Sequence, residues 1–347
     1  EKIGRQDGGT NQVLATIKSK DDVPFLSAPL IFVSTLLTHL TGGSAGREGA
    51  SIQFGGSIGN WLGKLAHLDE FDHHVMIMCG MSAAFAAVFG TPMAAAVFAM
   101  EVVSVGVMYY AALLPCVIAS IIAAEFATGM GIDPETFPVH SIPGLTVETG
   151  LKMALIAVGC GILSILFCIL LKTVGQLYTK YLKNPYIRIV VAAGVIILLT
   201  ICLNTKDYMG AGSGLIARAI EKGEARPLDF LWKMLLTALT MRAGYRGGEI
   251  VPAFSIGATF GCVAGGILGF SPELAAAASM VALFCGVTNC PITAMLISFE
   301  LFGFSGAAYY LIAISISYAV SGYYSLYKDQ TIVYSKYKAR YINRKTR

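Results

Sequence analysis

The sequence predicts an all-α membrane protein that crosses the bilayer several times and is built from two related halves. Of its 347 residues, 55% are hydrophobic and only 13% are charged, whereas a soluble domain carries about 25% charged residues. Two acidic motifs recur at a nearly constant offset, which indicates an internal duplication. Seven segments contain no Asp, Glu, Lys or Arg, namely 75–100, 102–124, 153–171, 189–205, 250–272, 274–299 and 301–327.

The charge-free segments predict membrane helices. Crossing a bilayer takes about 20 apolar residues, and a helix satisfies its own backbone hydrogen bonds in lipid. The competing interpretation is a large buried core of a soluble protein, and seven such segments in one chain argue against it. Polar breaks separate the segments at 69–73, 129–148, 183–188, 206–228 and 244–249, and all but the first contain Gly or Pro.

The charge distribution predicts the orientation and the domain boundaries. Residues 328–347 carry seven Lys or Arg against Asp329 alone. Because positive charge is enriched on the cytoplasmic side, we expect this tail to be cytoplasmic. We also expect the membrane to be a prokaryotic cell membrane, and we expect no nucleic acid as partner. We divide the chain into a first half with a linking helix (1–174), a second half (175–327) and the tail (328–347). The polar opening of the chain indicates that the first half lacks its N-terminal part.

The two related halves are recognised by their glutamates. Gly-Arg-Glu48 opens one apolar helix and Gly-Gly-Glu249 opens another, 201 positions later. A Pro precedes Glu101 by nine residues, and a second Pro precedes Glu300 by the same spacing, at an offset of 199. Transporters built from repeats place their site where broken helices of the halves meet. An odd number of spans between equivalent motifs would make the halves inverted.

The start of each repeated helix is a candidate anion site. A helix N-terminus exposes unpaired N–H groups and the positive end of the helix dipole, so it binds anions without a cationic side chain. We expect the starts near Gly46 and Gly248 to converge on one anion, with Gly49 allowing close approach of the backbone. Amide donors hold an anion without an ion pair, and conduction requires that the anion can leave again.

Glu48 is the candidate gate of this site. Burial favours the neutral form of a carboxyl group, whereas helix-start amides favour the charged form. The charged side chain would displace a bound anion, and the neutral side chain would swing away and carry a proton. The alternative is an acidic residue that only stabilises the helix start, by about 0.3–1 kcal/mol.

The other charged residues near these helix starts have two interpretations each. For Glu249, we expect the backbone N–H, together with that of Ile250, to matter more than the carboxylate. Arg47 either attracts anions or satisfies carbonyl groups of its loop. Glu101 and Glu300 are functional candidates because they are acids within apolar segments, and a structural partner at a helix end explains them equally well.

Other kinds of chemistry find little support. The sequence contains no His-Glu-x-x-His zinc motif, no phosphate-binding Gly-x-x-x-x-Gly-Lys-Ser/Thr loop and no convincing nucleophile elbow. We therefore expect no enzymatic activity and no cofactor, only chloride or fluoride bound as substrate. The alternative from another class is an intramembrane enzyme that uses Glu48 and Glu249 as a carboxylate pair on one cleft.

The ordered set of motifs resembles the CLC family of chloride channels and proton-coupled anion exchangers. Gly-Arg-Glu-Gly-Ala at 46–50 resembles the family's Gly-Arg-Glu-Gly-Pro signature, and Gly-Glu-Ile-Val-Pro at 248–252 resembles Gly-x-Phe-x-Pro. Two segments of Pro, apolar helix and Glu, ending at Glu101 and Glu300, follow in the family's order. The resemblance implies an inverted-repeat helical fold, broken helices that meet at a midplane anion site, and a homodimer in a lipid membrane.

The resemblance also implies roles for individual residues. Glu48 matches the external gating glutamate, and the amides of Glu249 and Ile250 match backbone ligands of the central anion. A tyrosine hydroxyl should complete that site, for which Tyr324 is the first choice and Tyr327 the second. Thr10 matches the hydroxyl of the family's first anion motif, which survives here only as Asp-Gly-Gly-Thr-Asn at 7–11.

One departure from the family pattern concerns the proton route. The exchangers' internal proton-transfer glutamate follows the position of Glu101, and Val102 stands there. Val102 and the Gly-Gly-Glu-Ile-Val-Pro form resemble the fluoride-exporting branch. We expect chloride/proton antiport gated by Glu48, with fluoride/proton antiport and a passive voltage-gated chloride channel as the alternatives.

Overall fold

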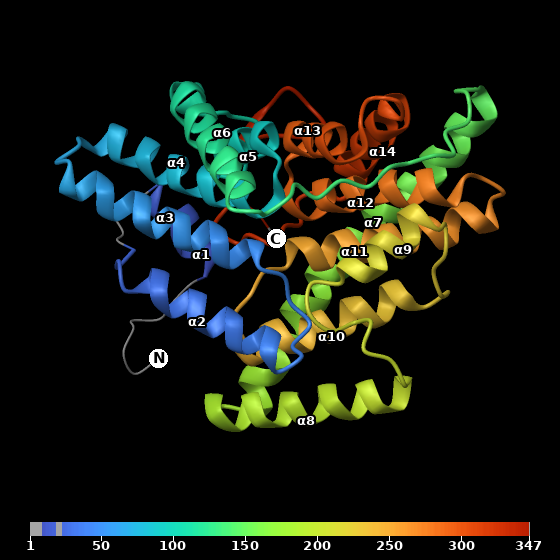
Figure 1. The fold of residues 1–347 in the computed structure, drawn as a ribbon, viewed down its shortest axis with the longest axis horizontal. Helices are drawn as coiled ribbons and strands as arrows, with labels where there is room; N and C mark the ends of the chain where they lie inside the picture. Colours follow the sequence, from blue (N-terminus) through green and yellow to red (C-terminus); the bar gives the residue numbers. More distant parts are fainter. Residues whose placement is uncertain (1–8, 19–22, 347) are drawn as a thin grey trace.

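The structure is a computed structural model that describes residues 9–18 and 23–346, and its elements are almost all helices, as predicted (Figure 1). The helices are α1 (Thr10–Thr16), α2 (Ser27–Leu40), α3 (Glu48–Leu65), α4 (Glu70–Phe89), α5 (Pro92–Glu101), η1 (Tyr110–Ala112), α6 (Leu113–Gly129), α7 (Val147–Tyr181), α8 (Pro185–Leu203), α9 (Ser213–Glu221), α10 (Asp229–Ala243), α11 (Ile250–Ile267), α12 (Pro272–Thr288), α13 (Pro291–Phe302) and α14 (Ala307–Val320). The strands are β1 (Ser104–Val105), β2 (Thr331–Tyr334) and β3 (Tyr341–Lys345).

The duplication predicted from the glutamates extends over whole helices. In the first half α3 packs on α4 and α2, and in the second half α11 packs on α12 and α10. Figure 1 shows the first set on the left and the second on the right, with the long helix α7 among the second set. Helix α7 runs unbroken through residues 174 and 175, so the boundary expected there falls within a helix.

The equivalent helices cross at small residues. A Cβ on Gly55 of α3 would overlap the carbonyl oxygen of Gly80 in α4, and a Cβ on Gly261 of α11 would overlap that of Ala275 in α12. Helix pairs in membranes use small residues in this way, because close backbone approach replaces the hydrophobic driving force that lipid removes. The Gly-rich composition of α3 and α11 is therefore a packing requirement.

Two of the charge-free segments are not single spans. Segment 75–100 breaks between α4 and α5, and segment 274–299 breaks between α12 and α13. Each break has a left-handed residue, Gly90 or Asn289, followed by a proline at the first helical position. A left-handed residue ends a helix, and proline starts the next one. Five of the described helices are long and apolar enough to cross a membrane, and five apolar helices are shorter.

Glu101 and Glu300 cap each other's helices. Glu300, at the end of α13, accepts hydrogen bonds from the amides of Met93 (2.8 Å) and Ala94 (2.9 Å) at the start of α5. Glu101, at the end of α5, accepts them from the first amides of α13. This exchange requires α5 and α13 to run antiparallel, which is the arrangement of inverted repeats. Both acids therefore have a structural partner at a helix end, which was one of the two interpretations given to them from the sequence.

The tail after α14 contains structure that the sequence did not indicate. Strand β1 pairs in parallel with β2, which pairs antiparallel with β3. Gln330, fully buried beside β2, donates to the carbonyls of Val102 (2.9 Å) and Thr288 (2.7 Å) and accepts from Asn289 and Ser325. The tail is thus tied to the ends of α5 and α12.

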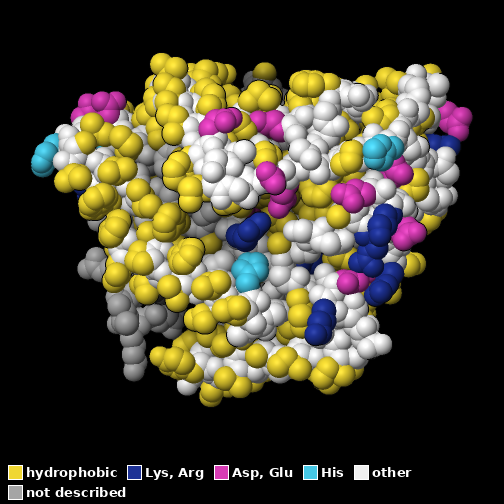
Figure 2. Space-filling model, in the orientation of Figure 1, with side chains coloured by type: hydrophobic (Ala, Val, Ile, Leu, Met, Phe, Trp, Pro, Cys, Tyr) yellow, Lys and Arg dark blue, Asp and Glu magenta, His cyan; other side chains and the backbone are white. Residues whose placement is uncertain are grey.

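The outer surface fits a lipid environment. Figure 2 shows hydrophobic side chains over the left and lower parts of the molecule, where α3, α2 and α8 lie, while charges gather in the middle and at the right. Helix α6 likewise exposes Leu114, Ile122 and Phe126. These apolar faces are what membrane helices present to acyl chains.

Candidate anion site

The starts of α3 and α11 meet, as the sequence predicted. Gly46 and Gly248 lie just before the two helices and form an antiparallel bridge, in which each amide donates to the other's carbonyl at 2.8 Å. A Cβ on Gly49 would lie 2.9 Å from the Cα of Gly248. Only glycine allows two backbones to approach this closely. The positive ends of two helices therefore point into one small region between the halves.

The carboxylate of Glu48 occupies that region. The side chain is fully buried, and Oε1 accepts a hydrogen bond from the amide of Val251 at 3.0 Å. The amide of Ile250 also interacts with the carboxylate. Oε2 has no hydrogen-bond partner among the residues that the structure describes. A negatively charged group thus sits on the start of α11, where a helix best stabilises an anion.

Two of the predicted anion ligands have a different role. The amides of Gly46 and Gly248 donate to each other, so neither is available to an anion in this arrangement. The two glycines instead leave room for the Glu48 carboxylate, because a Cβ on either residue would overlap it. The amides of Ile250 and Val251 face the carboxylate instead, and of these only Ile250 was predicted.

The charged residues around the site form ion pairs. Nη2 of Arg242 lies 3.5 Å from Oε1 of Glu249, so the Glu249 carboxylate forms an ion pair. The Glu48 carboxylate instead lies against backbone amides. The two carboxylates therefore have different kinds of partner. Arg47 is mostly exposed and lies 3.8 Å from Glu135 in the loop before α7. Burial raises the pKa of the Glu135 carboxyl group, which the charge of Arg47 partly opposes.

The predicted hydroxyl ligands lie at different distances from the helix starts. Thr10 donates to the carbonyl of Gly49 at 3.2 Å, which places its hydroxyl beside the start of α3. Tyr327 is buried and lies within electrostatic range of both Glu48 and Glu249. The carbonyl of Tyr324 accepts a hydrogen bond from Asn289 (3.0 Å) at the tail side of α12. Of the two candidates, Tyr327, the second choice, is thus the more deeply buried.

Lys233 is a charged residue near the site that the sequence reasoning missed. It lies in α10, is fully buried and interacts electrostatically with Glu48. Its amine donates to the hydroxyl of Ser44 (3.0 Å) and to the carbonyls of Tyr208 (3.1 Å) and Gly210 (2.7 Å). Within residues 9–18 and 23–346, no carboxylate lies within ion-pairing distance of it. A lysine flanked by Leu, Trp and Met in the run 230–236 was the signal that could have identified it.

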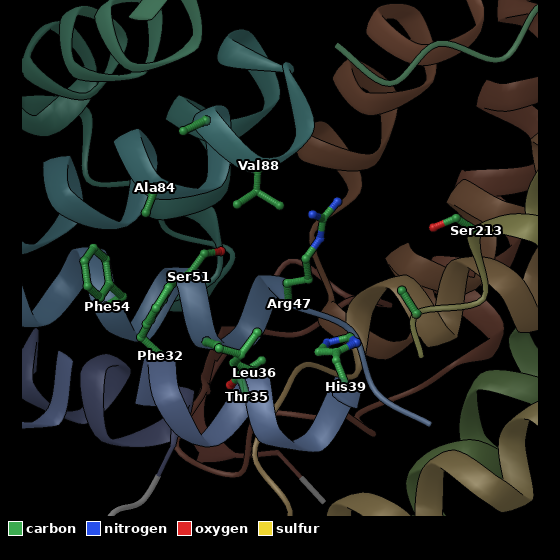
Figure 3. Close-up of a pocket in the computed structure, with 13 residues that line it drawn as sticks. Phe32, Thr35, Leu36, His39, Arg47, Ser51, Phe54, Ala84, Val88 and Ser213 are labelled. Carbon is green, nitrogen blue, oxygen red and sulfur yellow. The ribbon is translucent and has the colours of Figure 1, made fainter. Parts of the chain in front are cut away.

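A cavity of about 700 Å³ adjoins the start of α3. Figure 3 shows Arg47 and His39 side by side in its wall, with Phe32 and Phe54 farther along and Ser213 across from them. The cavity gives one face of the helix start an approach lined by a guanidinium group. No cluster of three or more His, Cys, Asp or Glu side chains suited to a metal ion occurs in the described part of the chain.

Comparison with known sequences gives a consistent result. The family model described as voltage gated chloride channel matches residues 1–322. A chloride/fluoride channel protein of Pseudomonas syringae pv. tomato is 33% identical over 341 residues, which cover 95% of this chain and 75% of that protein. The H(+)/Cl(−) exchange transporter ClcA of Vibrio cholerae is 28% identical over 272 residues, and the match covers 74% of this chain and 58% of the transporter.

Solved structures share the fold. The crystal structure of a CLC-type fluoride/proton antiporter superposes with a TM-score of 0.89 at 34% identity, over 93% of this chain and 82% of that one. A slow cyanobacterial Cl−/H+ antiporter superposes with a TM-score of 0.76 over 90% of this chain and 76% of that one. Its 18% identity supports the fold alone.

Proposed function

This chain belongs to the voltage gated chloride channel family, and we propose that it exchanges a small inorganic anion for protons across a cell membrane, with Glu48 as the gate. The observation that carries the proposal is the Glu48 carboxylate, which is fully buried on the start of α11. A negatively charged group held there by backbone amides occupies the position that a transported anion would take.

The geometry supports an exchange of the carboxylate for the anion. When Glu48 is charged, it holds the amide of Val251 and excludes an anion from the start of α11. When Glu48 is protonated, it loses most of its attraction to the helix dipole and the side chain leaves. An anion then takes its place, and the departing side chain carries the proton. The exchange requires no cofactor, because the anion and the proton are both substrates.

Fluoride is the substrate we favour, and chloride follows. The fluoride/proton antiporter superposes with this chain at 34% identity, against 28% for the chloride exchanger of Vibrio cholerae. Val102 in place of the exchangers' internal glutamate supports the same order. The order of the two substrates is therefore the reverse of the one that we favoured from the sequence alone.

We also propose a homodimer surrounded by lipid, with the tail at 328–347 on the cytoplasmic side. The apolar outer faces of the helices support a lipid environment. The seven basic residues of the tail support its orientation. The homodimer rests on family membership, and cross-linking of the purified protein tests it directly.

Flux from liposomes tests the substrate and the coupling together. Purified protein is reconstituted into vesicles loaded with potassium fluoride or potassium chloride, and anion efflux and external pH are recorded at the same time. Efflux of fluoride with simultaneous proton uptake, at a fixed ratio, is the expected result. Anion efflux that moves no protons and ignores the pH gradient would instead identify a passive channel.

Glu48→Gln tests the gate. A glutamine cannot take up a proton, so we expect proton movement to stop while anion flux persists or becomes independent of pH. Glu125→Gln is a suitable control, because it makes the same chemical change at an exposed glutamate of α6. Proton coupling that survives in Glu48→Gln would remove Glu48 from the mechanism.

A further inference from the structure

Val102 leaves open how a proton reaches the gate from the side of the tail, and the residue before it offers an answer. We propose that Glu101 is the group that takes up the proton on this side, in place of the carboxyl group that Val102 lacks. The inference rests on the proposed proton-coupled function. It gives Glu101 a second role beside its capping of α13.

Glu101 opens onto a cavity. It lines a pocket of about 430 Å³, together with Ser104, Asn289, Tyr318 and residues 106–108. The side chain is only 7% exposed, so solvent reaches it through this pocket or hardly at all. Ser104 pairs with Thr331 in the sheet that contains the tail. The pocket therefore opens on the tail side, which we propose is cytoplasmic.

Asn289 is a buried polar residue in the wall of the pocket. Its side chain is 1% exposed, and its Nδ2 donates to the Tyr324 carbonyl and the Gln330 side chain at 3.0 Å each. Its Oδ1 has no hydrogen-bond donor in the part of the chain that the structure describes, and an unsatisfied buried acceptor is unfavourable. Asn289 thus adds polar lining to the pocket beside Glu101.

Glu300 is the symmetric counterpart that separates proton uptake from capping. Both acids accept two amide hydrogen bonds at the start of the opposing helix. Only Glu101 also accepts a side-chain hydroxyl, that of Thr293, at 2.6 Å. Glu300 lies at the other end of α13, where the loop before α7 joins the helix through the amide of Phe137 and the carbonyl of Leu301. The pair thus shares one structural role on opposite sides of the protein.

Hydrogen bonds link the end of α5 to Tyr327. Gln330 donates to the carbonyl of Val102, next to Glu101, at 2.9 Å and accepts from the Ser325 hydroxyl, which in turn accepts from the amide of Tyr327 at 3.1 Å. Hydronium transfers a proton to a Glu101 oxygen, forming the carboxylic acid and leaving water. The acid then gives that proton to the Glu48 carboxylate, through the hydroxyl of Tyr327 or a water beside it, and returns to the charged form.

The titratable groups around Glu101 come from neighbouring elements and comprise Cys285 of α12, Cys290 just before α13 and Tyr318 of α14. Tyr318 also lines the pocket, and the amine of Lys336 in the tail lies 4.1 Å from the centre of its ring.

The matched variants Glu101→Gln and Glu300→Gln test the inference in the same liposomes. Each weakens one helix cap in the same way, so both should lower the unfolding temperature to a similar degree. We expect proton uptake to fall on the order of 100-fold in Glu101→Gln, with anion efflux preserved, and the wild-type ratio of protons to anions in Glu300→Gln. An unchanged ratio in Glu101→Gln would overturn the inference. A wild-type protein that moves no protons would overturn the proposed function instead.

A second variant protects the test against loss of folding. Val107 lines the mouth of the pocket and is 39% exposed, and it makes none of the hydrogen bonds of Glu101. Val107→Trp should fill the mouth and slow proton uptake without stopping anion efflux, whereas Val107→Ala should behave as wild type. Rapid proton uptake in folded Val107→Trp would show that protons do not enter here.

Discussion

Gly46→Ala should release the gate without touching the glutamate itself. The Cβ of an alanine at 46 would overlap the carboxylate of Glu48. Gly46 does not have a positive φ, so its backbone accepts an alanine. The overlapping atoms are at the end of a flexible side chain, which moves more easily than backbone. The substitution therefore removes Glu48 from the start of α11 while leaving the Gly46–Gly248 bridge in place.

The size of the effect follows from the interaction that is lost. The displaced carboxylate gives up its hydrogen bond from the Val251 amide, at 3.0 Å. A hydrogen bond to a charged group contributes about 1.5–3 kcal/mol. Because 1.4 kcal/mol corresponds to a factor of ten, the population with Glu48 seated on α11 should fall about 10- to 150-fold.

Anion efflux as a function of pH measures this shift. At high pH the wild-type gate is charged and seated, so efflux should be slow, whereas Gly46→Ala should keep a high rate. Gly266→Ala in α11 is the control, since no neighbouring atom lies within 4 Å of its new Cβ. A wild-type pH dependence in folded Gly46→Ala would refute either the seated position of Glu48 or its gating role.

Two further predictions concern stability. Lys233→Met leaves the carbonyls of Tyr208 and Gly210 without this donor, whereas the Ser44 hydroxyl keeps its hydrogen bond with Thr237. Thermal unfolding in detergent should therefore show a loss of about 1–3 kcal/mol for each unpaired carbonyl, and a loss no larger than that of the exposed control Lys172→Met would contradict this. Burial lowers the pKa of Lys336 to about 8, below its unfolded value of 10.5, so the folded state loses this proton first and stability should rise between about pH 8 and 10.5. The unfolding temperature of wild type, relative to Lys336→Met, should increase over that range, and a constant difference would show that the amine is not buried.

The fold class was predictable because its determinants are local. Charge-free segments, prolines at helix starts and glycines at crossings each report on their own neighbourhood, and the spacing of Glu48 and Glu249 revealed the duplication. The breaks at Gly90 and Asn289 were not predicted, because an apolar composition looks the same on either side of a short left-handed turn.

The site was only partly predictable, since contacts between distant segments decide its details. The sequence indicated two helix starts that converge, but not that the amides of Gly46 and Gly248 bond to each other. It also could not indicate that Tyr327 is more deeply buried than Tyr324, because burial in a loop depends on contacts with distant segments. Lys233 was missed because its partners lie in two loops far from it in the sequence, one at Ser44 and one at Tyr208 and Gly210.

The Gly46–Gly248 bridge limits how the protein can move. Two hydrogen bonds of 2.8 Å join the halves at the point where the anion would pass. Rocking one half against the other, as many repeat transporters do, would separate these groups inside a water-poor interior at a cost of about 1–3 kcal/mol for each unpaired group. The bridge therefore favours a mechanism in which the two halves keep their relative position. The moving part is then the Glu48 side chain alone, and we expect its rotation to set the turnover rate.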